Sequence, residues 1–238
     1  MLIPFVAATA YRPEVARAYD NLAVGYNNLG TEAYARGDYA GAAHYQELAL
    51  AESPGMLPAR LNLGQSLLAA GEYARAEEIF IKLRGSALDP VRLEHSISWA
   101  QRGRGDDLAA LDTLQRASEA PFAEGSIHAA LAQLYLDFGD TYNAREAARR
   151  AVELSPEMPD GYLALALAET DPSAAMEWLH AGLERCDYKA GLLLFAGELR
   201  GDEGLLREAA LTAAEEGNWT AWARALVSLS RLTTVSGM

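Results

Sequence analysis

The fold of this chain is decided by the stretch YNNLGTEAYARGDYAGAA, residues 26–43, because its main features return every 34 residues. Gly30 is followed 34 residues later by Gly64, and Gly37 is followed by Gly71. The same step leads on to Gly105, Gly139, Ala110 and Ala144. Internal periods of roughly 20 to 50 residues are typical of solenoids, so we expect a stack of small repeated units.

Each repeat is predicted to be two antiparallel helices joined by a tight turn, because apolar residues follow a period near 3.6 on both sides of each glycine-acid pair. A glycine just past a helix end takes the left-handed conformation without a Cβ clash. We therefore expect helices to stop at Gly37, Gly71, Gly105 and Gly139. The acid after each glycine can accept from free N–H groups at the next helix start, so capping is favoured over chemistry for Asp38, Glu72, Asp106 and Asp140.

Small residues at repeating positions are expected to let the helix backbones approach closely. These are Gly30, Gly64, Ala42, Ala76, Ala110, Ala132 and Ala144. Larger residues are expected to fill the space around them, namely Tyr45, Phe80, Tyr135 and Leu114. We interpret both sets as core.

The pattern of a large residue, Leu-Gly, Gly-x-Tyr, Ala, Ala and Pro resembles the tetratricopeptide repeat (TPR) over roughly residues 24–186. The first copy carries it from Tyr26 to Pro54, and the third copy is weaker because Ser98 replaces the first Gly and Asp107 replaces the Tyr. The resemblance implies an all-α, right-handed superhelix with a C-terminal capping helix.

The same register divides the chain into segments. We expect an N-terminal extension of the first helix in 1–23, and five TPR-like repeats in 24–187, at about 23–56, 57–90, 91–124, 125–158 and 159–187. A divergent sixth helical pair is expected in 188–216, broken at Gly201-Asp202, and a capping helix and tail in 217–238.

The last predicted helix carries an apolar stripe at helical spacing, formed by Trp219, Trp222, Leu226 and Leu229. A terminal repeat needs a cover with a polar outer face, so we interpret this helix as the solenoid cap. The alternative is a docking helix for a partner or for a second copy, because Trp is enriched at interfaces.

In TPR proteins the first helix of each repeat lines a concave groove that binds extended or helical segments of partner proteins. Carried over by register, the resemblance implies groove residues Asn27, Thr31, Tyr34, Leu61, Asn62, Gln65, Leu68, Arg92, His95, Trp99, Arg102, Ala129, Gln133 and Leu136. Some relatives clamp a partner's C-terminal carboxylate with Lys, Asn and Arg, but here only Asn62 and Arg92 match that set. A chaperone-tail partner is therefore not predicted.

One sharper hypothesis concerns the third repeat, where Arg92, His95, Trp99 and Arg102 lie at i, i+3, i+7 and i+10. A Trp flanked by Arg has the composition of a binding hot spot and favours an acidic or carboxylate-bearing segment. The alternative is that Trp99 packs against neighbouring helices and the arginines form a solvated face.

The net charge of −13 argues against nucleic acid as a partner, because phosphate binding depends on clustered Lys and Arg. It favours either a basic partner or simply solubility. The four histidines are scattered without ligand spacing, and we see no nucleophile or phosphate loop, so neither metal, cofactor nor enzymatic activity is predicted.

The lone Cys186 favours a reducing compartment, and we expect a cytoplasmic protein without a signal peptide or membrane span. The predicted function is a non-enzymatic scaffold or adaptor that binds another protein in the groove. Two alternatives stay open: a self-assembling structural protein, and a regulatory or recruiting subunit of an enzyme complex.

Overall fold

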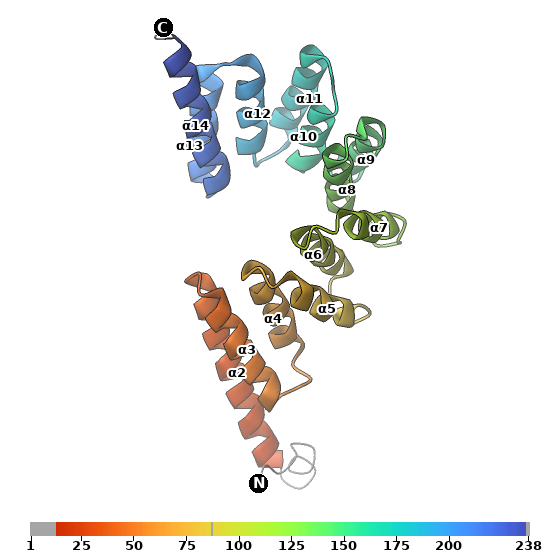
Figure 1. Ribbon diagram of the computed structural model, residues 1–238, viewed down its shortest axis with the longest axis vertical. Coiled ribbons are helices and arrows are strands. Elements are labelled where there is room, and N and C mark those ends of the chain that lie inside the picture. Colours follow the sequence, from red (N-terminus) through yellow and green to blue (C-terminus); the bar gives the residue numbers. More distant parts are fainter. Residues whose placement is uncertain (1–12, 87, 237–238) are drawn as a thin grey trace. The chain divides into compact units, whose positions relative to one another are not determined.

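The computed structural model describes residues 13–86 and 88–236, which contain thirteen helices and no strand (Figure 1). The helices are α2 (Pro13–Ala35), α3 (Tyr39–Glu52), α4 (Leu57–Ala69), α5 (Tyr73–Leu83), α6 (Pro90–Gly103), α7 (Asp107–Ser118), α8 (Gly125–Asp137), α9 (Thr141–Leu154), α10 (Pro159–Leu167), α11 (Pro172–Arg185), α12 (Ala190–Arg200), α13 (Glu203–Glu215) and α14 (Trp219–Ser236). The predicted all-α class is confirmed.

The chain forms two compact units, residues 1–113 (unit 1) and 114–238 (unit 2), and the boundary falls within α7. In unit 1, α2 packs against α3, α3 against α4, α4 against α5 and α5 against α6. In unit 2, α8 packs against α9, α10 against α11, α12 against α13 and α13 against α14. The first helices of successive pairs also meet, as α2 meets α4 and α8 meets α10.

The glycines predicted to end helices do so in the left-handed conformation. Their φ values are 79° at Gly37, 81° at Gly71, 77° at Gly105 and 74° at Gly139. The amide of the next residue donates to the carbonyl five positions earlier, as Asp38 does to Ala33 at 3.0 Å. This six-residue loop is the Schellman closure of a helix C-terminus.

Three of the four predicted caps are confirmed, and one is wrong. Asp38, Asp106 and Asp140 each accept from the amide three residues on, at 2.9, 3.2 and 3.1 Å. Glu72 makes no such bond, because its longer side chain reaches Arg75 instead, with an N–O distance of 2.6 Å.

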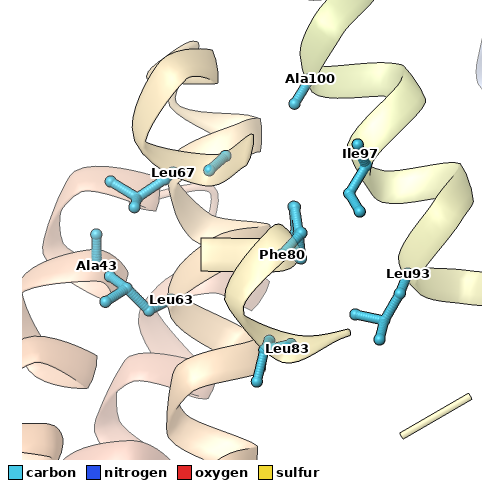
Figure 2. Packing of buried hydrophobic residues seen from close by; sticks show 9 residues of the cluster. Ala43, Leu63, Leu67, Phe80, Leu83, Leu93, Ile97 and Ala100 are labelled. Carbon is cyan, nitrogen blue, oxygen red and sulfur yellow. The ribbon is translucent and has the colours of Figure 1, made fainter. Parts of the chain in front are cut away.

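The core of unit 1 is built around the side chains of α5. Figure 2 shows Phe80 lying between α4 and α6, with Leu63 and Leu67 on one side and Leu93 and Ile97 on the other. These residues are buried, so one apolar cluster joins successive pairs. Such nearest-neighbour packing is what stabilises a solenoid.

The core of unit 2 contains a helix whose buried face is made of alanine alone. On α9 the buried face consists of Ala144, Ala147, Ala148 and Ala151. Tyr162 of α10 is fully buried, and its hydroxyl donates to the Pro156 carbonyl at 2.9 Å. Burying an aromatic ring together with a satisfied hydroxyl fixes the start of α10 against the end of α9.

The last described helix packs on α13, but with a different face from the one we expected. Its buried residues are Ala221 and Ala225, which join a cluster with the alanines of α13. Of the predicted stripe only Leu229 packs against this cluster. Trp219 and Trp222 are 64% and 38% exposed, so the indole rings do not form the interface and the outer face of α14 is not polar. Alanine faces on both helices allow a close approach that indole rings would prevent.

Candidate functional site

The residues predicted to line a groove lie on the first helices of their pairs, and all but Ala129 are exposed or partly exposed. The exposed ones are Thr31, Tyr34, Arg92, Trp99, Arg102 and Gln133, and the partly exposed ones are Asn27, Leu61, Asn62, Gln65, Leu68, His95 and Leu136. The 34-residue register therefore selects positions that solvent can reach.

On α2 and α4 the structure brings two of these side chains together. The Asn62 amide nitrogen donates to the Asn27 side-chain oxygen at 3.0 Å, and this pair is partly buried. Thr31 donates to the Asn27 backbone carbonyl at 3.0 Å. These bonds hold the polar side chains in one orientation on adjacent first helices.

On α6 the indole of Trp99 is 68% exposed. Another face of this helix supplies the core, through Ile97 and Ala100, so Trp99 does not fill it. Arg92 and Arg102 are exposed on the same helix, and the Arg102 guanidinium lies 3.8 Å from the Asp107 carboxylate. The helix thus presents an aromatic side chain between two cations.

In unit 2 the predicted residues Gln133 and Leu136 lie on α8, where the Gln133 amide donates to Asp137 at 3.0 Å. Sequence reasoning missed a groove of about 240 Å³ further along this unit. Its lining comes from α10, α12 and α14 with the residue before α14, namely Leu163, Leu167, Gly191, Leu194, Phe195, Glu198, Asn218, Thr220, Ala221 and Arg224. Extending the 34-residue register would have predicted part of it, because Leu163 and Leu167 of α10 lie 34 residues after Ala129 and Gln133.

The polar rim of this groove is held by Glu198. Its carboxylate accepts from the Arg224 guanidinium at 2.9 Å and from the Ser228 hydroxyl at 2.8 Å. The apolar part of the lining is mainly leucine and phenylalanine. An apolar lining with a few fixed polar groups suits an apolar side chain of a bound segment.

Titratable groups outside these faces have structural explanations. Burial, and then the charge of Arg150, lowers the pKa of His128. Burial raises the pKa of the Cys186 thiol, which keeps it protonated and unreactive. Among the described residues, no group of His, Cys, Asp and Glu could hold a metal ion, and no described helix is long and apolar enough to span a membrane.

Comparison with known proteins gives the same repeat. One family model of the tetratricopeptide repeat matches residues 33–92, and a second matches residues 125–158. The search of curated proteins found no match.

Several solved structures are similar in fold. A thermophilic TPR protein of Thermus thermophilus has a TM-score of 0.56 at 22% identity, over 74% of this chain and 98% of that one. PilF of Pseudomonas aeruginosa gives 0.59 at 17% identity, over 87% and 97%. The MamA protein gives 0.55 at 22% identity, over 69% and 91%. These likenesses confirm the predicted all-α TPR superhelix.

Proposed function

Because this chain is a tetratricopeptide-repeat protein, a class that generally mediates protein–protein interaction, we propose that it is a scaffold that binds a segment of another protein on the first helices of unit 1. The segment would lie across α2, α4 and α6 as an extended peptide or a helix. The scaffold itself would position the partner without catalysing a reaction.

The observation that carries this proposal is the exposure of Trp99 on α6. A large aromatic ring that is 68% exposed costs solvation free energy in the unbound protein, and a partner that covers it recovers that cost. Trp is also the residue type most enriched at binding hot spots. We therefore assign Trp99 as the anchor of the face.

The charges beside Trp99 favour an acidic or carboxylate-bearing partner. Arg92 and Arg102 are exposed on the same helix, in a chain whose net charge is −13. The ion pair of Arg102 with Asp107 is long and solvent-exposed, so it contributes little and can give way to a carboxylate from a partner.

The proposal is tested by selecting random displayed peptides on the full chain and on two variants, Trp99→Ala and Leu108→Ala. Leu108 is the matched control, because it is 72% exposed in unit 1 but lies on the second helix of its pair. We expect peptides selected on the unaltered chain to lose affinity about 30-fold, roughly 2 kcal/mol, with Trp99→Ala only. Equal affinity for both variants would contradict the assignment.

The partner chemistry is tested with the same peptides on an Arg92→Glu, Arg102→Glu variant. If the arginines attract carboxylates, the selected peptides are enriched in Asp and Glu and bind this variant more weakly, and their affinity falls as salt rises. Peptides without acidic enrichment that bind both chains equally would leave Trp99 as the anchor but exclude an acidic partner.

We also propose a cytoplasmic location. It is supported by Cys186, the one cysteine of the sequence, which is buried with a protonated thiol and so suits a reducing environment. Fractionation of the native cells with a specific antibody would test it, and recovery in an extracytoplasmic fraction would contradict it.

A further inference from the structure

The helix α14 occupies the place of a first helix in a further pair. In α12, Leu192 and Ala196 pack back onto the preceding pair, in a cluster with Leu179 of α11. Ala221 and Ala225 of α14 lie 29 residues later and pack back onto α13 in the same way. Both helices therefore present equivalent faces at equivalent positions.

The adjacent face of α12 packs against the second helix of its own pair. Leu193 belongs to the cluster with Leu206 of α13, and a Cβ on Gly197 would lie only 2.8 Å from the Leu206 side chain. Twenty-nine residues later, the same face of α14 carries Trp222 and Leu226. In complete pairs this is the face on which a second helix lies.

No described helix covers this face of α14. Trp219 is 64% exposed, Trp222 38% and Leu226 41%, and the two indole rings stack edge to face with centroids 6.1 Å apart. We call Trp219, Trp222 and Leu226 the α14 stripe; Leu229, at its edge, packs against the cluster of α12 and α13. A stripe of this composition on an outer helix marks an interaction surface.

The α14 stripe has no charged residue, so a second copy of the chain can approach it without charge repulsion. The charged residues of α14 are Arg224 and Arg231, which line the hollow on the opposite side toward α12, and Arg224 is bound to Glu198. Between and beside the stripe residues lie Ala223 and Ser230. Two copies of a chain with net charge −13 repel each other over most of their surface, but not along this stripe.

We propose that the stripe is covered by the α14 of a second copy, which packs antiparallel to it across a two-fold axis. In complete pairs the second helix runs antiparallel to the first, and a two-fold axis perpendicular to a helix generates the same antiparallel arrangement. Inner helices such as α4 already pack against a neighbour on each side, α3 and α5. An α14 held between its own α13 and the α14 of a second copy repeats that environment.

The dimer is expected to be weak and reversible. Two tryptophans and one leucine in each copy, partly covered already, bury less than the ~800 Å² per partner of a standard interface. We therefore expect a dissociation constant on the order of tens of micromolar, and a monomer at nanomolar concentration.

Sedimentation velocity of the full chain between about 1 and 300 µM tests the proposal. The unaltered chain should shift from monomer to dimer over this range, and a Trp222→Glu, Leu226→Glu variant should stay monomeric. Leu211→Glu is the matched control, because Leu211 of α13 is 69% exposed and off the stripe, and it should dimerise as the unaltered chain does. An unaltered chain that stays monomeric at 300 µM, or a double variant that still dimerises, would overturn the proposal.

A cysteine variant tests the geometry without disturbing the packing of α14 on α13. Near a two-fold axis, Leu226→Cys would meet its own copy and form a disulfide-linked dimer on mild oxidation, whereas Leu211→Cys would not. Cys186 can stay in place because it is buried. Equal cross-linking of both variants would show random collision and contradict the two-fold arrangement.

The dimer and the proposed binding of a partner are independent of each other. Trp99→Ala should leave sedimentation unchanged, and the stripe variant should keep its affinity for peptides selected on unit 1. Circular dichroism of each variant, matched to the unaltered chain, shows that a loss reflects the surface and not the fold.

Discussion

Gly64 of α4 lies against Phe80 of α5 so closely that a Cβ on the glycine would come within 2.7 Å of the Cε1 atom of the ring. Phe80 is fully buried and joins α4 to α6 in the core of unit 1. The ring therefore cannot move aside without disturbing the next pair. The glycine is required here by the space between two helices and not by its backbone conformation.

Replacing Gly64 with Ala should destabilise the protein by about 1–3 kcal/mol, because the added methyl overpacks the contact with Phe80. Gly25→Ala is the control, since nothing lies within 4 Å of its Cβ position in α2, and it should stabilise by about 0.4–1 kcal/mol. Urea unfolding measures both. A Gly64→Ala variant as stable as the Gly25→Ala variant would show that Phe80 yields freely.

The unequal caps predict unequal costs of removing them. Asp140→Ala should destabilise the protein, because the carboxylate accepts from the Asn143 amide and caps α9. Glu72→Ala should cost less than half of that, since it removes only an exposed ion pair with Arg75. Chemical denaturation of both variants in one buffer compares them. A larger loss for Glu72 would mean that its carboxylate caps α5 in solution.

Hydrogen bonds to Asn143 lower the pKa of Asp140 in the folded protein. A depressed carboxyl pKa stabilises the fold above the unfolded pKa, and that contribution is lost as pH falls through the folded pKa. The difference in stability between the unaltered chain and Asp140→Asn should therefore be present at pH 7 and shrink toward pH 3. Thermal melts across this range would show it, and a constant difference would refute it.

The environment of His128 predicts a second dependence of stability on pH, in mildly acidic solution. Burial lowers its pKa below 6.5, so the folded chain binds a proton less readily than the unfolded chain. Stability should therefore fall as pH drops from above 6.5 toward the folded pKa. A His128→Gln variant should lose less stability than the unaltered chain between pH 7.5 and 5.5, as thermal melting can measure.

The third helical pair should be the first to exchange its amide hydrogens. It lacks the small residue and the aromatic residue of the repeat, since Ser98 and Asp107 stand at those positions, and the boundary between the two units falls within α7. Solenoid stability is a sum of local terms, so a weak pair opens at lower free energy. Hydrogen exchange with peptide-level mass spectrometry tests this, and equal protection of α4 and α6 would contradict it.

The repeat pattern predicts the helices and their turns because it records local requirements, such as a positive φ at Gly37 or a missing Cβ at Gly64. It also places Trp99 on an accessible face, since the register is the same in every pair. The repeat pattern fails to predict the buried face where one helix has two apolar faces, either of which could pack against its neighbour. The α14 pattern favours burial of Trp219 and Trp222, but the alanines of α13 require small residues opposite them, and Ala221 and Ala225 meet that requirement.

The site is less predictable than the fold for a related reason. The groove of unit 2 is formed by α10, α12 and α14, and the spacing between these helices departs from 34 residues. Gly191 and Ala221 therefore fall outside the 34-residue register that relates Leu163 to Ala129. The sequence likewise does not show that Glu72 pairs with Arg75, because this pairing depends on the rotamers of the two side chains and a pattern of residue types contains no rotamers.

The recurrent turn at Gly37, Gly71, Gly105 and Gly139 also makes the chain modular in length. Because each turn is closed by the same local bonds, removing or duplicating one whole period between two of these glycines, such as residues 38–71, rejoins helix ends that were already compatible. Growth by tandem duplication would then need no new loop. It would need only a first and a last helix whose outer faces are compatible with solvent or with a partner.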